Sequence, residues 1–216
     1  MGNYATQEEL DALYDYRASV AVPKVFFGKP FDAKDTVYRG LLDMAQWYVR
    51  DFTSKTQNGL WLHGNTPGSG KSHLAAFILE GVIRKGYIGV WWNLPRLLSE
   101  IRATFNAPRE EQLATEACIM DEIVESHLLV IDDLGAERHK GTDDFASDVL
   151  YRIVNDRYED TKPIIVTSNL SPREYAAKFK GDGMERIVSR FAGMSGGVYA
   201  FPTTDQRRNR YREAHS

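Results

Sequence analysis

The stretch "LWLHGNTPGSGKSHLA", residues 60 to 75, decides the fold. It carries Gly70, Lys71 and Ser72 in the order of the phosphate-binding loop, whose pattern is G-x-x-x-x-G-K-[ST]. The first glycine of that pattern should stand at position 65, but Asn65 stands there and the glycine is Gly64. Either Asn65 takes the glycine's place, since Asn enters left-handed conformations more readily than most residues, or the loop has one extra residue and Gly64 keeps its role.

An apolar strand precedes this loop and a helix follows it, as a working phosphate-binding loop requires. Backbone N–H groups of the turn and the helix N-terminus would surround the phosphates. Lys71 would reach the β- and γ-phosphates, and Ser72 would bind Mg²⁺. The alternative is a surface turn with an exposed lysine. The predicted nucleotide-binding residues are Asn65, Thr66, Pro67, Gly68, Ser69, Gly70, Lys71, Ser72 and His73.

The rest of the chain alternates apolar strands with helices. We expect strands at 59–64, 87–93, 127–133, 162–169 and 196–202. We expect helices within 1–20, 33–52, 71–86, 95–126 (broken near 106–110), 143–158, 171–179 and 184–191. Strands that are apolar throughout and alternate with helices predict an α/β fold, with a parallel sheet covered by helices on both faces.

The segment "LLVIDDLGAE" (128–137) ends a buried strand with two carboxylates. In open α/β sheets ligands bind at the carboxyl ends of the strands. Asp132 would hold the Mg²⁺ shell, and Asp133 would orient or deprotonate an attacking water. The alternative is a carboxylate pair that caps the following turn.

Two further segments gain meaning from their order in the chain. "PIIVTSN" (163–169) places Asn169 at the end of a buried strand, where it could position the water from the other side. "MERIVSRF" (184–191) places Arg186 and Arg190 four residues apart, on one helix face. Read alone, Asn169 is a turn former and the arginines form an exposed basic face.

Taken together, these segments resemble the AAA+ ATPases, and more narrowly the DnaC/IstB-like group, which includes bacterial and phage helicase loaders. The resemblance rests on "GSGKSHLA", "LLVIDDLGAE", "LYRIVNDRY", "IIVTSNLS" and the upstream "VPKVFF", and it covers roughly residues 22 to 212. It implies the cofactors ATP and Mg²⁺, Asn169 as the sensor residue, and Arg190 as an arginine finger with Arg186 in support. Arg102, Phe105 and Arg109 become candidate contacts to single-stranded DNA, because aromatic rings stack on bases and arginines meet phosphates. The alternative for each is a core or solvated side chain.

Composition sets the remaining expectations. The chain has 216 residues, 43% hydrophobic and 26% charged, with a net charge of −3, so any DNA binding must come from a local patch. The polar, acidic start lacks the features of a signal peptide, no apolar run could span a bilayer, and the single Cys118 is expected in the core; a cytoplasmic location is predicted. We expect a short N-terminal arm at 1–21, an ATPase domain at 22–216, and no C-terminal helical lid domain.

The favoured function is an ATP-dependent loader or remodeller of a replicative DNA helicase of the DnaB type, which binds single-stranded DNA. Slow ATP hydrolysis would be completed by Arg190 of a neighbouring subunit in a ring or spiral. Two alternatives stay open. One is an IstB-like transposition ATPase acting on duplex DNA, and the other is a nucleotide-binding module with little hydrolysis.

Overall fold

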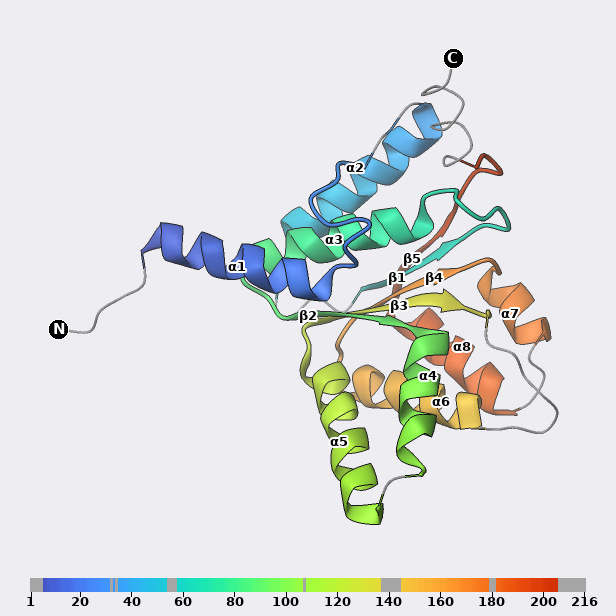
Figure 1. Cartoon of the computed structure of the whole chain (residues 1–216). Coiled ribbons are helices and arrows are strands. Elements are labelled where there is room, and N and C mark those ends of the chain that lie inside the picture. The colour runs from blue at the N-terminus through green and yellow to red at the C-terminus, as the bar shows by residue number, and fades with distance from the viewer. Residues whose placement is uncertain are drawn as a thin grey trace, which may run out of the picture.

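A computed structural model describes residues 6–31, 33, 35–53, 58–106, 108–136, 145–178 and 182–205. Its centre is a parallel five-stranded sheet in the order β2-β3-β4-β1-β5 (Figure 1). The strands are β1 (Gly59–His63), β2 (Gly89–Asn93), β3 (Leu128–Leu134), β4 (Ile164–Ser168) and β5 (Ser195–Ala200). The predicted parallel α/β sheet is confirmed, and the carboxyl ends of all five strands lie along one edge.

The helices cover both faces of this sheet. They are α1 (Gln7–Ala21), α2 (Thr36–Asp51), α3 (Lys71–Arg84), α4 (Leu94–Thr104), α5 (Arg109–Glu125), α6 (Phe145–Glu159), α7 (Pro172–Lys178) and α8 (Asp182–Met194). Figure 1 shows α1, α2 and α3 on one side of the sheet, and α4, α5, α6 and α8 on the other. Several ends are fixed by side-chain caps, such as the capping box of Thr6 and Glu9 on α1 and the Asp35 cap on α2.

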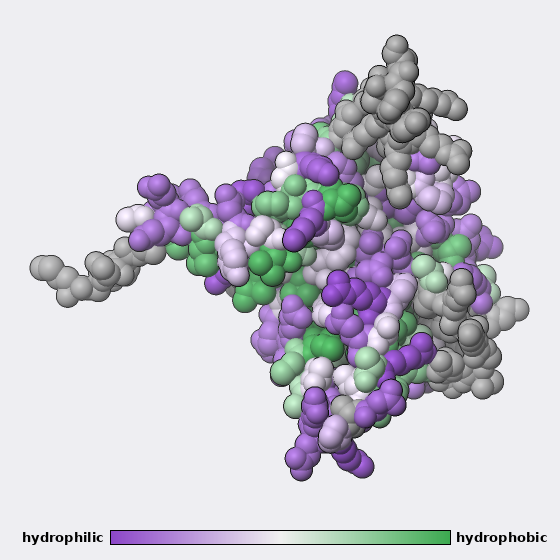
Figure 2. All heavy atoms as spheres, viewed as in Figure 1, coloured by the Kyte–Doolittle hydropathy of each residue, from purple (hydrophilic) through white to green (hydrophobic). Residues whose placement is uncertain are grey.

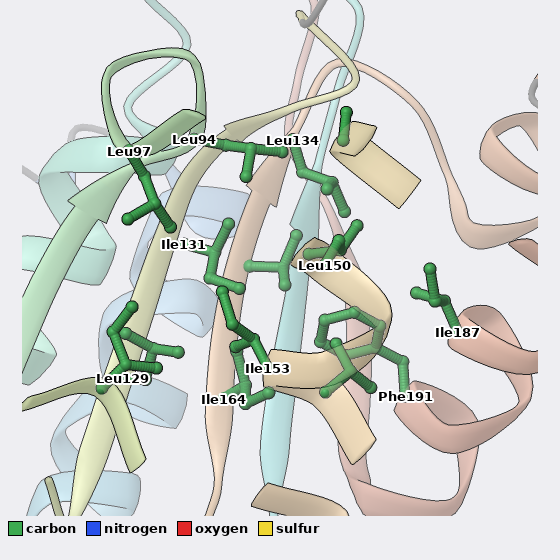
Figure 3. Packing of buried hydrophobic residues seen from close by; sticks show 14 of the residues in the cluster. Leu94, Leu97, Leu129, Ile131, Leu134, Leu150, Ile153, Ile164, Ile187 and Phe191 are labelled. Atoms are coloured by element: carbon green, nitrogen blue, oxygen red, sulfur yellow. The ribbon is translucent and has the colours of Figure 1, made fainter. Parts of the chain in front are cut away.

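The core is divided by the sheet into two clusters. Leu128 and Val130 of β3 pack with the helices α2 and α3, whereas Leu129 and Ile131 face the opposite cluster under α6 and α8. Figure 3 shows this second cluster, with Ile187 and Phe191 of α8 at one side. A strand with apolar residues on both faces is what a sheet covered on both sides requires.

One buried cation joins elements at the amino ends of the strands. Arg157 of α6 is 0% exposed. Its guanidinium donates hydrogen bonds to the carbonyl oxygens of Ile123, Ser126 and Pro163 at 2.5, 3.0 and 2.8 Å, and to the Ser126 hydroxyl at 2.9 Å. It thereby ties α6 to the end of α5 and to the segments that lead into β3 and β4.

Cys118 was expected in the core, and that prediction is wrong because Cys118 is exposed on α5. Only Met120 and Ile123 of this helix are buried, so α5 presents a narrow apolar face to the body of the protein. Its other sides, including the one that carries Cys118, face solvent.

Three expectations concern the ends of the chain and its surroundings. α1 packs on α3, with Ala18 fully buried, and the boundary expected between residues 21 and 22 stays a prediction. The expectation about a lid concerns residues after Asp205, which lie outside the described residues. Within the described ranges, no helix combines the length and apolar character needed to cross a membrane.

Candidate nucleotide-binding site

A pocket of about 390 Å³ lies at the carboxyl ends of the central strands. This is the edge where open α/β sheets bind ligands. Most of the predicted nucleotide-binding loop lines the pocket, and Asp133 and Asn169 line it too. The lining residues are Val25, Phe26, Lys29, Pro67, Gly68, Ser69, Gly70, Lys71, Ser72, His73, Asp133 and Asn169. The structure thus brings together residues about 100 positions apart in the sequence, as the motif order predicted.

The loop between β1 and α3 turns on two glycines in the left-handed region. Gly68 has a φ of 79° and Gly70, which precedes α3, has a φ of 99°. Outside glycine, Asp133 and Thr161 are the described residues with positive φ, so Asn65 does not use the left-handed conformation considered for it. Packing explains why position 64 is a glycine, because a Cβ there would lie 3.0 Å from the backbone oxygen of Phe201. The displaced glycine therefore serves the contact between β1 and the segment after β5.

Lys71 organises this loop from within. Its ammonium group donates hydrogen bonds to the carbonyl oxygens of Gly64 and Thr66 at 2.8 and 3.2 Å, and to the Ser69 hydroxyl at 3.2 Å. The hydroxyl of Tyr38 on α2 donates to the carbonyl of Ser69 at 2.9 Å. The reading of this stretch as a surface turn with an exposed lysine is wrong, since Lys71 is only 8% exposed.

Ser72, which lines the pocket, is hydrogen-bonded to Asp132, which is buried and does not line it. The Ser72 hydroxyl donates to Oδ1 of Asp132 at 2.7 Å, and the Thr167 hydroxyl donates to the same oxygen at 2.6 Å. Burial raises the pKa of Asp132, while the hydrogen bonds from Thr167 and Ser72 oppose that rise. The hydroxyl and carboxylate are oxygen donors of the kind that Mg²⁺ prefers, and they already lie within hydrogen-bond distance. These two residues therefore fit a magnesium ion.

Asp133 points into the pocket from the end of β3. It is exposed, has a φ of 61°, and accepts a hydrogen bond from Nδ2 of Asn93 at 3.0 Å. Asn93 ends β2 and also caps α4, because its Oδ1 accepts the backbone N–H of Arg96 at 3.3 Å. Asn93 was not among the predicted site residues, because a single Asn after a strand is indistinguishable from a turn former in the sequence.

A segment upstream of the loop closes one side of the pocket. Phe26 stacks on the ring of His73 with 5.5 Å between centroids, and His73 Nε2 lies 3.2 Å from the carbonyl oxygen of Lys29. His73 therefore supports this segment as well as lining the pocket. Val25, Phe26 and Lys29 were not predicted as site residues, although the "VPKVFF" segment had signalled the resemblance.

The two arginines of α8 lie outside this pocket, in a depression with Glu185 and Ser189. Arg186 is exposed. Arg190 is half-buried, with its guanidinium carbon 4.9 Å from the ring centre of Tyr151 and 5.9 Å from that of Tyr158. Its Nε is buried, and no described group accepts a hydrogen bond from it. Arg190 is thus held against α6, while Arg186 is presented to the surroundings.

The three candidate DNA contacts gather at the far end of α4 and the start of α5. Arg102 lies 4.8 Å above the ring of Phe145, and Phe105 meets the same ring at 5.5 Å between centroids. Phe105 nevertheless stays 51% exposed, and Arg109 begins α5 in an exposed position. Phe105 is therefore not a core residue, and a role of these side chains in DNA binding stays a prediction.

Comparison with known proteins identifies the family of this chain. The model of the family described as "IstB-like ATP binding protein" matches residues 33–190. The replicative helicase loader DnaC of Escherichia coli K12 is 27% identical over 151 residues, which are 69% of this chain and 56% of DnaC. A putative ATP-binding protein in an insertion sequence of Mycobacterium tuberculosis is 30% identical over 118 residues, covering 55% of this chain and 43% of that protein. The chain spans about half the length of the curated relatives it matches.

Solved structures agree on the fold. A crystal structure of the DnaC helicase loader superposes with a TM-score of 0.64 at 24% identity, covering 83% of this chain and all of the other. At that identity the likeness establishes the fold alone, a parallel sheet covered by helices with a P-loop after its first strand. Because the family model matches well over half of the sequence, this chain belongs to the family of IstB-like ATP-binding proteins.

Proposed function

We propose that this protein is an ATP-dependent loader of a replicative DNA helicase. The observation that carries the proposal is the hydrogen bond to Asp132 from Ser72, which lines a P-loop pocket together with Asp133 and Asn169. A hydroxyl and a carboxylate joined in this way form the metal-binding pair of an ATPase. The similarity to the helicase loader DnaC supports the choice of substrate and partner.

In this proposal each pocket residue has a task. Lys71 exchanges its bonds to the loop carbonyls for bonds to the β- and γ-phosphates, because an ammonium group binds phosphate oxygens more strongly than neutral carbonyls. Ser72 and Asp132 hold Mg²⁺, which when bound neutralises charge on the phosphates. Asp133 accepts a proton from the attacking water or orients it, and Asn169 fixes the water from the opposite side.

An arginine of α8 from a second copy would complete this site. Both arginines lie outside the pocket of their own chain, so neither can reach the phosphates there without a rearrangement. We assign the contact to Arg186, which is exposed, and give Arg190 the role of holding α8 on α6 through Tyr151 and Tyr158. The resemblance alone favoured Arg190. Such a head-to-tail contact builds rings or open spirals, and an isolated copy would hydrolyse ATP slowly.

The partner would be a DnaB-type helicase, and the nucleic acid would be single-stranded DNA, with Arg102, Phe105 and Arg109 as contacts. The experiment that tests this is light scattering of the protein mixed with the replicative helicase of its own host, with ATP and without. A discrete complex larger than the helicase hexamer, whose amount depends on the nucleotide, is expected.

A second candidate function is a transposition ATPase acting on duplex DNA. The family match and the similarity to an ATP-binding protein of an insertion sequence favour it. If no helicase complex forms under any nucleotide condition, this function takes precedence. Binding to duplex DNA would then exceed binding to a single strand of the same length in a fluorescence anisotropy titration.

A further inference from the structure

The pairing of β3 with β4 is irregular at the two carboxylates. Ile131 pairs with Val166 and Leu134 pairs with Ser168, so Asp132 and Asp133 together face Thr167 alone. Two residues against one is a β-bulge, which bends the strand and re-aims side chains, and bulges recur beside active sites.

The bulge reverses the alternation of β3. Leu129 and Ile131 point into the cluster under α6 and α8, and with regular alternation Asp133 would follow them there. Instead Leu134 joins that cluster (Figure 3). Asp133 is exposed. The extra residue thus releases a carboxylate from the core and aims it into the nucleotide pocket.

Thr167 satisfies the groups that the bulge leaves unpaired. Its hydroxyl oxygen accepts the backbone N–H of Asp133 at 3.1 Å, and it lies 2.6 Å from Oδ1 of Asp132. Because an N–H can only donate, the single hydroxyl hydrogen of Thr167 is left for the carboxylate. Oδ1 of Asp132 therefore accepts two hydroxyl hydrogens, from Thr167 and from Ser72, which fix the direction of its carboxylate.

We propose that Thr167 is the positioning residue of the metal-binding pair. One hydroxyl group holds the Asp132 carboxylate toward Ser72 and, through the backbone, holds Asp133 in its left-handed conformation. Thr167 itself is 1% exposed and does not line the pocket, so it acts through its two neighbours. The inference rests on the proposed function, since it presumes that Mg²⁺ and ATP bind here.

Thr167→Val tests this, because valine keeps nearly the same shape and replaces the hydroxyl with a methyl group. Binding of a fluorescent ATP analogue is titrated with Mg²⁺, and again in EDTA. We expect the Mg²⁺ concentration that gives half of its effect on binding of the ATP analogue to rise about 10–100-fold, the range found when groups that orient metal ligands are removed. Affinity in EDTA should stay within about twofold, because the hydrogen bonds of Lys71 to Gly64, Thr66 and Ser69 do not involve Thr167.

Thr167→Ser should restore most of the Mg²⁺ response, and Thr167→Ala provides a second variant if valine prevents folding. Ser168→Ala is the matched control: its hydroxyl donates to the carbonyl of Leu134 and accepts from the N–H of Leu170, without touching a carboxylate. We expect it to lower the melting temperature and leave the Mg²⁺ response unchanged.

Two negative results distinguish a failure of the role given to Thr167 from a failure of the proposed function. A Thr167→Val protein that melts earlier but responds to Mg²⁺ like the wild type would show a merely structural threonine and overturn this inference alone. A wild type that binds no ATP analogue with or without Mg²⁺ would overturn the proposed function, and this inference with it.

Discussion

Replacing Arg157 by Met should cost the protein a large part of its stability and leave its nucleotide site intact. Methionine fills much of the same space, so the change removes the charge and the donors rather than opening a large cavity. Arg157 is fully buried and binds three backbone carbonyls and one hydroxyl.

The magnitude follows from opposing effects. A hydrogen bond from a charged donor contributes roughly 1.5–3 kcal/mol, and a buried carbonyl left without a donor costs about 1–3 kcal/mol. Against this, burial lowers the pKa of Arg157 to about 10. This lowering of the pKa means that holding the charge costs ~3 kcal/mol, which the variant recovers. The loss of several bonds outweighs this gain, and we expect the free energy of unfolding to fall by about 3–5 kcal/mol.

Urea unfolding followed by tryptophan fluorescence measures the effect as a lower midpoint with an unchanged slope. Arg157→Lys is the control: it keeps the charge, but one ammonium cannot bridge the end of α5 and Pro163 at once, so an intermediate loss is expected. Binding of an ATP analogue well below the melting temperature should not change, since the bonds of Arg157 lie at the amino ends of β3 and β4. If the free energy of unfolding of the Met variant falls by less than about 1 kcal/mol, the reasoning is refuted. The hydrogen bonds of Arg157 would then only offset the cost of burying its charge.

The other predictions concern the nucleotide site. Lys71→Ala should abolish binding of a fluorescent ATP analogue; unchanged affinity would show that the site is elsewhere. Asp133→Asn should reduce kcat on the order of 10²-fold at unchanged ATP affinity, as expected for loss of a general base; unchanged turnover and partner binding would favour the module with little hydrolysis. Burial raises the pKa of Asp132, so between its pKa in the unfolded chain and its higher pKa in the folded protein, only the folded protein keeps the proton. The free energy of unfolding therefore falls as the pH rises through this range, and it levels off above it. Asp132→Asn should remove this pH dependence and stabilise the ligand-free protein at neutral pH by about 1 kcal/mol, as thermal unfolding from pH 4 to 8 would report. Arg186→Ala should lower turnover on the order of 10³-fold, and adding the Lys71→Ala protein, which still carries Arg186, should restore it. If Arg186→Ala is fully active, and the Lys71→Ala protein instead restores the turnover of Arg190→Ala, then Arg190 is the arginine finger.

The sequence was enough to predict the sheet, the phosphate-binding loop and the two carboxylates. These features depend on contiguous patterns: an apolar run, a glycine-rich turn and a helix with its cap. Asn93 and Thr167 were missed because their importance arises from pairings between strands, where one side chain at the end of β2 or β4 meets β3. Nothing local distinguishes them from an ordinary turn residue or strand residue.

Surface exposure was also hard to predict. Cys118 lies in an apolar helical pattern of the sequence, yet α5 uses only a narrow face for packing. Arg190 and Arg186 share one helix face in the periodic pattern, but the tyrosines that cover Arg190 come from α6, about 30–40 residues away. Apolar character alone does not predict burial, since Figure 2 shows apolar residues among polar ones on the visible face of the protein.

The bulge opposite Thr167 makes the segment from Ile131 to Leu134 easier to shorten by one residue than to lengthen. Exchanging a carboxylate for an amide or a longer acid keeps every other side chain on its own side of the sheet. Losing a single codon there would remove the bulge and leave Leu134, which is 1% exposed, two positions after Ile131, so both side chains would still face the same core cluster. Gaining a single codon would turn Leu134 away from that cluster. In a collection of random mutants of this gene, substitutions at positions 132 and 133 and in-frame deletions of either codon should therefore yield folded proteins without activity, while in-frame insertions of one codon should yield proteins that do not fold.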